Sequence, residues 1–354
     1  MKNSLRNTKR STGVAAAVLG ASALVLSACG AAPEESAGGG AEEVDYLACM
    51  VSDEGGFDDG SFNQASYEGL VQAEEELGVQ TREAESGAST DMGPNLDQMV
   101  SAGCDTIVTA GFMFEDLPLN EAEANAETNF VVVDYGYEEL PENMRTLNYK
   151  TGEAAYLAGY AAAAYSESGK VGTFGGAEIA TVTDFMVGFE KGVQKFNEDK
   201  GADVAVEGME TFVGNFSDTV KAKQISENLL SSGVDVIMPV AGPLGQTTVD
   251  AVNESSSETD AVVWVDTDGH EYANGGDTAV LTSVMKNMGL TVFESIEMDV
   301  NGEFASEAYL GTLENGGVGI APFYEFEGDL PKGTIDELDA LKEQIIAGEI
   351  DPLG

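Results

Sequence analysis

Residues 46–70 read YLACMVSDEGGFDDGSFNQASYEGL and contain the first repeating unit of the fold. Residues 46–51 form a continuous apolar run, which is typical of a strand buried on both faces of a parallel sheet. A glycine-rich acidic turn begins at Asp53, and residues 62–77 have the apolar spacing of an amphipathic helix. We therefore expect a strand–turn–helix unit with Phe62 and Asn63 in the first helical turn, beside free backbone N–H groups.

The same alternation of apolar runs and helical patterns continues along the chain in two series. Strand-like runs follow at residues 106–109, 130–133, 170–175, 204–209, 234–240, 261–266 and 280–284, with helix-like stretches between them. This order predicts two consecutive βαβ arrays. Because parallel crossovers are right-handed, each array should form a doubly wound lobe that binds ligands outside the carboxyl ends of its strands.

Four polar residues and one glycine mark these strand ends. Asp53 and Asp134 follow runs of the first array, whereas Gly242 and Asp266 follow runs of the second and Lys286 ends its last run. We expect all five to face one cleft between the lobes.

Later segments fix how the lobes are connected. Residues 290–300 and 317–326 need partners after the second array is complete, so the chain should cross between the lobes three times. We expect an N-terminal lobe from residues 44–149 plus about 285–323, and a C-terminal lobe from residues 150–284 plus about 324–354.

The amino terminus has the layout of an export signal. A basic start and a short apolar run end in small residues before Cys29, and the apolar run is too short to span a bilayer. Leu26 to Cys29 resembles the lipobox of bacterial lipoproteins, in which residues 1–28 are removed and Cys29 is lipidated. The alternative is a secretory signal that contains a cysteine by coincidence. Residues 29–43 are too poor in apolar side chains to fold and read as a flexible tether.

The charge balance excludes a nucleic-acid binder. The chain has 16 Lys plus Arg against 63 Asp plus Glu, for a formal charge of −47, whereas binding to phosphates requires a basic surface. Because the surfaces of neighbouring molecules carry the same negative charge, they repel each other, which favours a soluble monomer.

Cysteine and histidine are scarce, with three Cys and one His in the chain, which argues against a zinc enzyme or a disulfide-stapled scaffold. Cys49 and Cys104 each lie near an apolar strand and could pair in an exported protein. Buried free thiols are the interpretation that we favour. His270 lies in a turn and is expected at the surface.

The acidic turn at Asp53 has two simpler interpretations than ligand binding. A calcium loop would need oxygen ligands at alternating positions and a closing Glu, and this spacing is absent. Asp58, Asp59 or Ser61 could instead cap the following helix, which is the interpretation we favour for these three residues.

The stretch DEGGFDDGSFNQASYEGL from Asp53 resembles the first signature of the basic membrane protein family of substrate-binding lipoproteins for ABC transporters. Further matching stretches occur in order: GFMFED from Gly111, VVVDY from Val131, GTFGGAEIATVTDFMVGFEKG from Gly172, GNFSDTVKAK from Gly214, WVDTD from Trp264, TSVMK from Thr282 and GGVGIAPF from Gly316. The resemblance implies an α/β type I periplasmic-binding-protein fold, with two doubly wound parallel-sheet lobes joined by three crossovers. It also implies a purine nucleoside as the ligand.

The resemblance carries over the family's ligand contacts where the same residue types stand here, at Asp53, Phe62, Asn63, Asp134, Gly242, Asp266 and Lys286. Phe62 would stack on the base. Phe216 is our first choice for a second ring, with Phe212 and Phe185 as alternatives.

This set of residues suits a purine nucleoside on chemical grounds. Two phenyl rings can clamp a flat base, while carboxylates accept hydrogen bonds from base N–H groups and ribose hydroxyls. We expect Asp266 to bind the ribose diol and Asp134 to read the base. Lys286 would compensate the buried carboxylates.

We therefore predict a lipoprotein anchored on the extracytoplasmic face of the cell membrane, without a cofactor or catalytic activity. It would pass a nucleoside to an ABC permease driven by a separate ATPase subunit, because the sequence has no Gly-x-x-x-x-Gly-Lys-Ser/Thr loop of its own. A ligand-sensing lipoprotein and an extracellular nucleoside hydrolase are the alternatives. If Phe216 is misassigned, a sugar-like or small polar ligand is the alternative.

Overall fold

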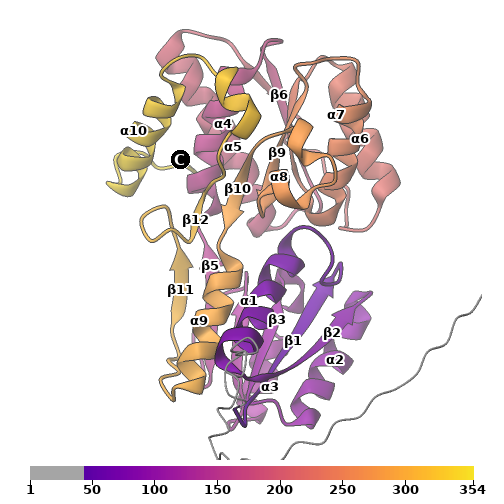
Figure 1. Cartoon of the computed structure of the whole chain (residues 1–354), viewed down its shortest axis with the longest axis vertical. Coiled ribbons are helices and arrows are strands. Elements are labelled where there is room, and N and C mark those ends of the chain that lie inside the picture. Colours follow the sequence, from indigo (N-terminus) through magenta and orange to yellow (C-terminus); the bar gives the residue numbers. More distant parts are fainter. Residues whose placement is uncertain (1–43) are drawn as a thin grey trace, which may run out of the picture. The chain divides into compact units, whose positions relative to one another are not determined.

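The computed structural model describes residues 44–354, shown in Figure 1. The predicted signal peptide, residues 1–28, the lipidation site Cys29 and the tether, residues 29–43, lie outside the described residues. None of the helices in the described part combines the length and the apolar character needed to cross a membrane.

The first sheet has the strand order β11-β5-β4-β3-β1-β2, and all of its strand pairs are parallel. Its strands are β1 (Leu47–Glu54), β2 (Gln80–Ser86), β3 (Thr106–Ala110), β4 (Asn129–Val133), β5 (Met144–Tyr149) and β11 (Ala308–Gly311). The helices of this lobe are α1 (Phe62–Leu77), α2 (Ser89–Ala102), α3 (Leu117–Ala124) and α9 (Met288–Val300), with a 3-10 turn η1 (Phe112–Phe114).

Alternate residues of β1 supply the cores on the two faces of this sheet. Ala48 and Met50 pack with side chains of α1 and α9, whereas Cys49 and Val51 pack with side chains of α2. A strand covered by helices on both faces explains why β1 reads as a continuous apolar run.

The second sheet has the order β12-β10-β9-β8-β6-β7 and is parallel except for β12, which runs antiparallel to β10. Its strands are β6 (Lys170–Gly175), β7 (Ala205–Glu207), β8 (Val236–Val240), β9 (Ala261–Asp266), β10 (Val280–Lys286) and β12 (Val318–Ile320). Its helices are α4 (Thr151–Tyr165), α5 (Ala180–Lys200), α6 (Thr219–Ser231), α7 (Gln246–Glu254), α8 (Gly269–Tyr272) and α10 (Thr334–Ile346), with 3-10 turns η2 (Gly242–Gly245), η3 (Gly276–Thr278) and η4 (Tyr324–Gly328).

The chain passes between the two sheets three times, after β5, after β10 and between β11 and β12. In Figure 1 the orange α9 and β11 accordingly lie among the indigo and magenta elements of the first lobe. The predicted fold of two doubly wound lobes with three crossovers is confirmed.

The lobe boundaries themselves remain a prediction, and strand pairing departs from them at one place. Residues 318–320 fall within the range of about 285–323 that we expected in the first lobe, but they form β12 in the second sheet. The chain returns to the second lobe earlier than expected because β12 forms backbone hydrogen bonds with β10.

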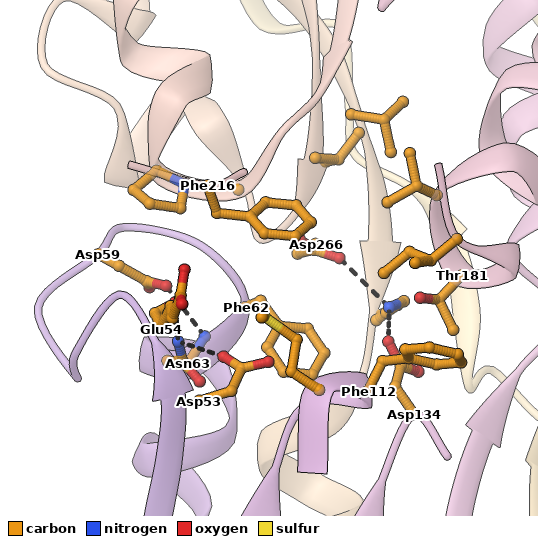
Figure 2. A pocket seen from close by; sticks show the side chains of 18 of the residues that line it. Asp53, Glu54, Asp59, Phe62, Asn63, Phe112, Asp134, Thr181, Phe216 and Asp266 are labelled. Carbon is orange, nitrogen blue, oxygen red and sulfur yellow. Dashed lines mark hydrogen bonds and ion pairs between the residues drawn. The ribbon is translucent and has the colours of Figure 1, made fainter. Parts of the chain in front are cut away.

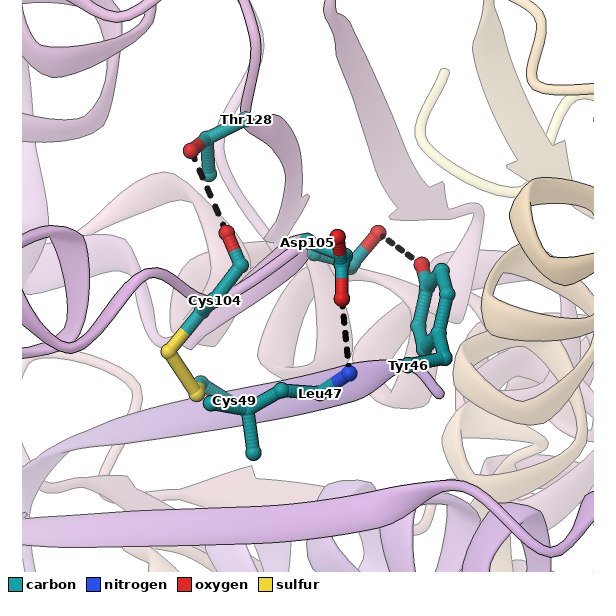
Figure 3. The surroundings of a disulfide bond; sticks show 7 residues. Tyr46, Leu47, Cys49, Cys104, Asp105 and Thr128 are labelled. Atoms are coloured by element: carbon teal, nitrogen blue, oxygen red, sulfur yellow. Dashed lines mark hydrogen bonds between the residues drawn. A yellow bond between two sulfur atoms is a disulfide. The ribbon is translucent and has the colours of Figure 1, made fainter. Parts of the chain in front are cut away.

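Cys49 and Cys104 form a disulfide, with their Cα atoms 6.0 Å apart (Figure 3). Our preference for buried free thiols is therefore wrong. The sheet order places β3 directly beside β1, so Cys104, just before β3, comes close to Cys49. Local sequence patterns do not encode which strands lie side by side.

Candidate ligand-binding site

One pocket lies where the strand ends of the two lobes meet, and Figure 2 shows the side chains around it. Residues from both lobes line it. All eight residues predicted from the sequence are among them: Asp53, Phe62, Asn63 and Asp134 from the first lobe, and Phe216, Gly242, Asp266 and Lys286 from the second. The structure thus brings together every predicted site residue that it describes.

One end of the pocket is built around the ammonium group of Lys286, the last residue of β10. This group donates a hydrogen bond to Asp134 and lies 3.6 Å from Oδ1 of Asp266. All three residues are buried, with exposed fractions of 5%, 5% and 6% for Lys286, Asp134 and Asp266. The buried ammonium is thus paired with two carboxylates. This pairing offsets the free-energy cost of removing the charged groups from water.

The pKa values of this group follow from burial and pairing. Burial alone would lower the pKa of Lys286, but the attraction of Asp134 and Asp266 outweighs this effect and raises the pKa above its ordinary value. Burial also raises the pKa of Asp134, although the neighbouring Lys286 opposes that shift. Lys286 therefore stays a cation.

The other end of the pocket contains Asp53 and Asn63. The amide Nδ2 of Asn63 donates to Oδ1 of Asp53 at 3.2 Å and to the carbonyl of Glu54 at 3.4 Å. These two acceptors fix the orientation of the amide, and among the described residues nothing donates to its buried Oδ1. Burial raises the pKa of Asp53 to about 8.

Gly111, directly after β3, allows this arrangement. A Cβ atom at Gly111 would lie 1.8 Å from Oδ2 of Asp53, so a side chain here would displace the carboxylate. Its φ of 133° also disfavours other residues. The motif GFMFED therefore begins with a glycine that the position of Asp53 requires.

Phenylalanine rings from opposite lobes line the middle of the pocket. Figure 2 shows Phe216 on its upper side and Phe62 on its lower side. Of the two alternatives to Phe216, Phe185 also lines the pocket, and the Lys286 ammonium lies 5.4 Å from its ring centre and 5.0 Å from that of Phe62. Phe212 is not among the lining residues and packs against Gly175 instead.

Helix α1 begins at Phe62 because its first turn is capped by Asp59. The carboxylate of Asp59 accepts hydrogen bonds from the backbone N–H groups of Ser61, Asn63 and Gln64 at 2.9–3.2 Å. The predicted capping role is therefore confirmed for Asp59. This cap holds Phe62 and Asn63 at the pocket.

Ser61 does not cap the helix, contrary to our expectation. Its hydroxyl donates to Oδ2 of Asp266 at 3.0 Å, in the opposite lobe. Asp58 makes none of the capping bonds found at α1. The sequence could not reveal the Ser61 contact, because it depends on how the lobes meet.

Sequence reasoning also missed Phe112 and Thr181, which line the pocket from η1 and from the first turn of α5. Both lie within stretches that carry the family resemblance, GFMFED and GTFGGAEIATVTDFMVGFEKG. The family resemblance therefore covered both residues. They were missed because neither directly follows a strand, where we expected ligand contacts.

The charges around the pocket disfavour anionic ligands. Besides Asp53, whose pKa of about 8 keeps it protonated at neutral pH, four carboxyl groups line it, from Glu54, Asp59, Asp134 and Asp266, against the ammonium of Lys286. Such a surface accepts hydrogen bonds from a neutral ligand rich in N–H and O–H groups. Within residues 44–354, no group of three or more His, Cys, Asp or Glu side chains is arranged to hold a metal ion.

Known proteins are similar to this chain over most of its length. Residues 47–351 match the family model Bmp, described as ABC transporter substrate-binding protein PnrA-like. The "ABC transporter nucleoside-binding protein BmpA" of Lactococcus lactis subsp. cremoris is 30% identical, over 97% of this chain and 98% of that protein. The "CD4+ T-cell-stimulating antigen" of Listeria innocua is 28% identical, over 97% and 98% of the respective chains.

A solved structure of similar fold is that of an ABC transporter system solute-binding protein from Aeropyrum pernix K1. It superposes with a TM-score of 0.78 at 26% identity, covering 86% of this chain and 92% of that chain.

Proposed function

The chain belongs to the Bmp family of PnrA-like ABC transporter substrate-binding proteins, and on that premise we propose that it captures a purine nucleoside between its lobes. Its role is that of the solute-binding protein of an ABC transporter. The partners of such a protein are a small-molecule ligand and the transporter subunits that receive it. The finer assignment to a nucleoside rests on the chemistry of the pocket.

The observation that carries this proposal is the pair Phe62 and Phe216, which face the pocket from opposite lobes with polar groups at either end. A purine is flat and apolar on its faces and forms hydrogen bonds only at its edge. Two phenyl rings can cover the faces while carboxylates take the donors at the edge. The relative in Lactococcus lactis is named as a nucleoside-binding protein, which supports this choice.

The geometry favours one orientation of the ligand. Asp134 and Asp266 share the ammonium of Lys286, so we propose that both lie at the ribose end and that the diol donates to their carboxylates. Asp53 and Asn63 would then meet the base. This changes our expectation that Asp134 reads the base.

Nucleotides are poor candidates for the same pocket. At the ribose end a phosphate group would meet the carboxylates of Asp134 and Asp266, with Lys286 already paired to both of them. Like charges at short range in a site shielded from water repel strongly. We therefore propose selection for the nucleoside over its phosphorylated forms.

Export and anchoring complete the proposal. We propose that Cys29 is lipidated after removal of residues 1–28 and holds the protein on the extracytoplasmic face of the membrane. Labelling with a radioactive fatty acid should mark the wild type and spare Cys29→Ser. Equal labelling of both proteins would contradict the anchor.

Calorimetric titration of ligand-stripped protein tests the ligand. Inosine, guanosine and adenosine should bind, whereas guanosine monophosphate and free ribose should bind far more weakly. Asp266→Ala should weaken nucleoside binding by about 2–5 kcal/mol, roughly 30-fold or more, because it leaves the Lys286 ammonium partly unpaired and removes an acceptor. Absence of nucleoside binding to the wild type would refute the purine assignment.

The same samples test for turnover. Incubation of the protein with each nucleoside should release no free base above a protein-free blank, with or without added calcium. Release of base would favour the hydrolase alternative.

A further inference from the structure

Ser61 is fully buried at the start of α1, and its hydroxyl reaches across the boundary between the lobes. It donates to Oδ2 of Asp266, while Oδ1 of Asp266 lies 3.6 Å from the Lys286 ammonium. Asp266 is thus held from two sides. The Lys286 contact comes from its own sheet and the Ser61 contact comes from the other lobe.

A second hydrogen bond links Gly60 and Thr267, the chain neighbours of Ser61 and Asp266. The Thr267 hydroxyl donates to the backbone carbonyl of Gly60 at 2.8 Å, also across the lobe boundary. The indole N–H of Trp264 donates to the same hydroxyl at 3.0 Å and fixes its direction. Ser61 therefore contacts Asp266, and the preceding Gly60 contacts the following Thr267. We call these four residues the cross-lobe junction.

Three of the four junction residues are buried, and Gly60 is partly buried. Ser61 is 0% exposed, Asp266 6% and Thr267 5%. A hydrogen bond to a buried carboxylate is stronger than one to a neutral acceptor, and a buried donor that loses its acceptor carries a desolvation cost. Both contacts therefore favour the arrangement in which the two lobes meet.

We propose that Ser61 is a positioning residue for Asp266, and that the cross-lobe junction couples closure of the lobes to the orientation of this carboxylate. The part that concerns ligand rests on the proposed function, in which Asp266 binds the ribose. When the lobes separate, Oδ2 of Asp266 loses the Ser61 donor. Escape of the ligand therefore requires the junction to break.

Ligand kinetics test the positioning role, with guanosine as the probe. Ser61→Ala should raise the dissociation constant about tenfold, mainly through faster dissociation. Ser66→Ala is the matched control, because Ser66 is an equally buried serine of α1 whose hydroxyl, among the described residues, donates within its own lobe, to the Phe62 carbonyl and the Met288 sulfur. This control should change the dissociation rate less than twofold.

A double-mutant cycle separates positioning from a general packing defect. If Ser61 acts through Asp266, Ser61→Ala should cost less than about twofold in affinity when Asp266 is already replaced by Asn. An equally large loss in both backgrounds, or no loss in either, would overturn the positioning role.

Hydrogen exchange tests the junction without reliance on nucleoside binding. Thr267→Val keeps the shape of the side chain and removes its hydroxyl, so segments 54–62 and 264–272 should both exchange faster. Thr248→Val is the matched control, because its buried hydroxyl contacts Ser226 within the second lobe. It should leave segment 54–62 unchanged.

The outcomes separate the two proposals. Unchanged exchange of both segments in Thr267→Val, with and without guanosine, would overturn the junction even if guanosine binds. Faster exchange in a protein that binds no nucleoside would support the junction and refute the proposed ligand.

Discussion

Asp134 and Asp266 occupy corresponding places in the two lobes, and both contact the ammonium of Lys286. Asp134 directly follows β4 and Asp266 ends β9, and each of these strands is third in the order of its sheet. Both residues have a left-handed backbone, with φ of 63° and 72°. This conformation costs about 1–3 kcal/mol in a non-glycine residue and is found where the surroundings impose it. Here it occurs where two carboxylates meet one cation.

Replacement of Lys286 by Met should therefore destabilise the protein in a pH-dependent way. The change leaves the carboxylates of Asp134 and Asp266 buried without a cation, which costs about 3–5 kcal/mol when one partner of a buried ion pair is removed. Burial already raises the pKa of Asp134, and loss of the ammonium removes the effect that opposes this shift, so protonation of Asp134 relieves part of the cost and the loss of unfolding free energy should be larger at pH 8 than at pH 5. Denaturant titration at both pH values measures it.

The control is Lys332→Met, because Lys332 is exposed and contributes to none of the salt bridges found in the described residues. It should shift the unfolding free energy by less than about 0.5 kcal/mol. Equal destabilisation of Lys286→Met at pH 5 and pH 8 would show that the ammonium does not neutralise these carboxylates.

The absence of a side chain at Gly176 leaves room for the Phe216 ring. A methyl group at position 176 should therefore weaken stacking of Phe216 on the base of the ligand. A Cβ atom at Gly176 would lie 2.3 Å from the Phe216 ring, so the ring must shift from its place in the pocket. Loss of one stacking face is worth about 1–3 kcal/mol, so Gly176→Ala should weaken guanosine and adenosine alike by roughly fivefold to a hundredfold. Calorimetric titration of each nucleoside checks this.

Gly328→Ala provides the comparison, because a Cβ atom there would meet nothing within 4 Å. It should bind both nucleosides as the wild type does. If Gly176→Ala also binds normally, Phe216 is not a stacking ring, and the choice of base-binding residues must be revised.

The carboxyl group of Asp53 should make stability fall as the pH rises. Burial raises its pKa to about 8 in the folded protein, with Asn63 opposing the shift and Asp59, Asp134 and Glu54 adding to it. Between about pH 4 and pH 8 the folded protein holds a proton that the unfolded chain has lost, so unfolding free energy decreases across this window. Asp53→Asn removes the titrating group.

Relative to the wild type, Asp53→Asn should therefore be more stable at pH 9 than at pH 5, by about 1 kcal/mol or more, which is roughly 2 °C or more in melting temperature. Thermal unfolding at pH 5, 7 and 9 measures the difference. Asp339→Asn, at an exposed position of α10, should follow the wild-type profile. Parallel profiles for all three proteins would show that Asp53 titrates normally.

Sequence patterns predicted the fold and the strand-end residues because both depend on local order along the chain. Apolar runs mark buried strands, and the residue after each run necessarily lies at the edge of the sheet where ligands bind. This logic found Asp134, Asp266 and Lys286 without knowledge of their contacts.

The remaining features depend on which elements lie side by side. The Cys49–Cys104 disulfide follows from the position of β3 beside β1, and the Ser61–Asp266 hydrogen bond follows from contact between lobes. Neither is encoded in the periodicity of a single segment. The residues involved are therefore visible in the sequence, but their partners are not.

The Cys49–Cys104 disulfide should contribute to stability and leave the ligand site intact. It closes a loop with a sequence separation of 55, for which the restriction of the unfolded chain is worth about 4 kcal/mol at most, and measured values are commonly 2–4 kcal/mol. Cys104 precedes β3, at the end of the sheet opposite the pocket. Reduction should lower the unfolding free energy by that amount while guanosine affinity changes less than twofold. Denaturant titration with and without reductant measures the loss, and a Cys49→Ala, Cys104→Ala double variant should be insensitive to the reductant. Coincident unfolding curves for the oxidised and reduced wild type, with reduction verified by thiol counting, would show that the bond adds nothing.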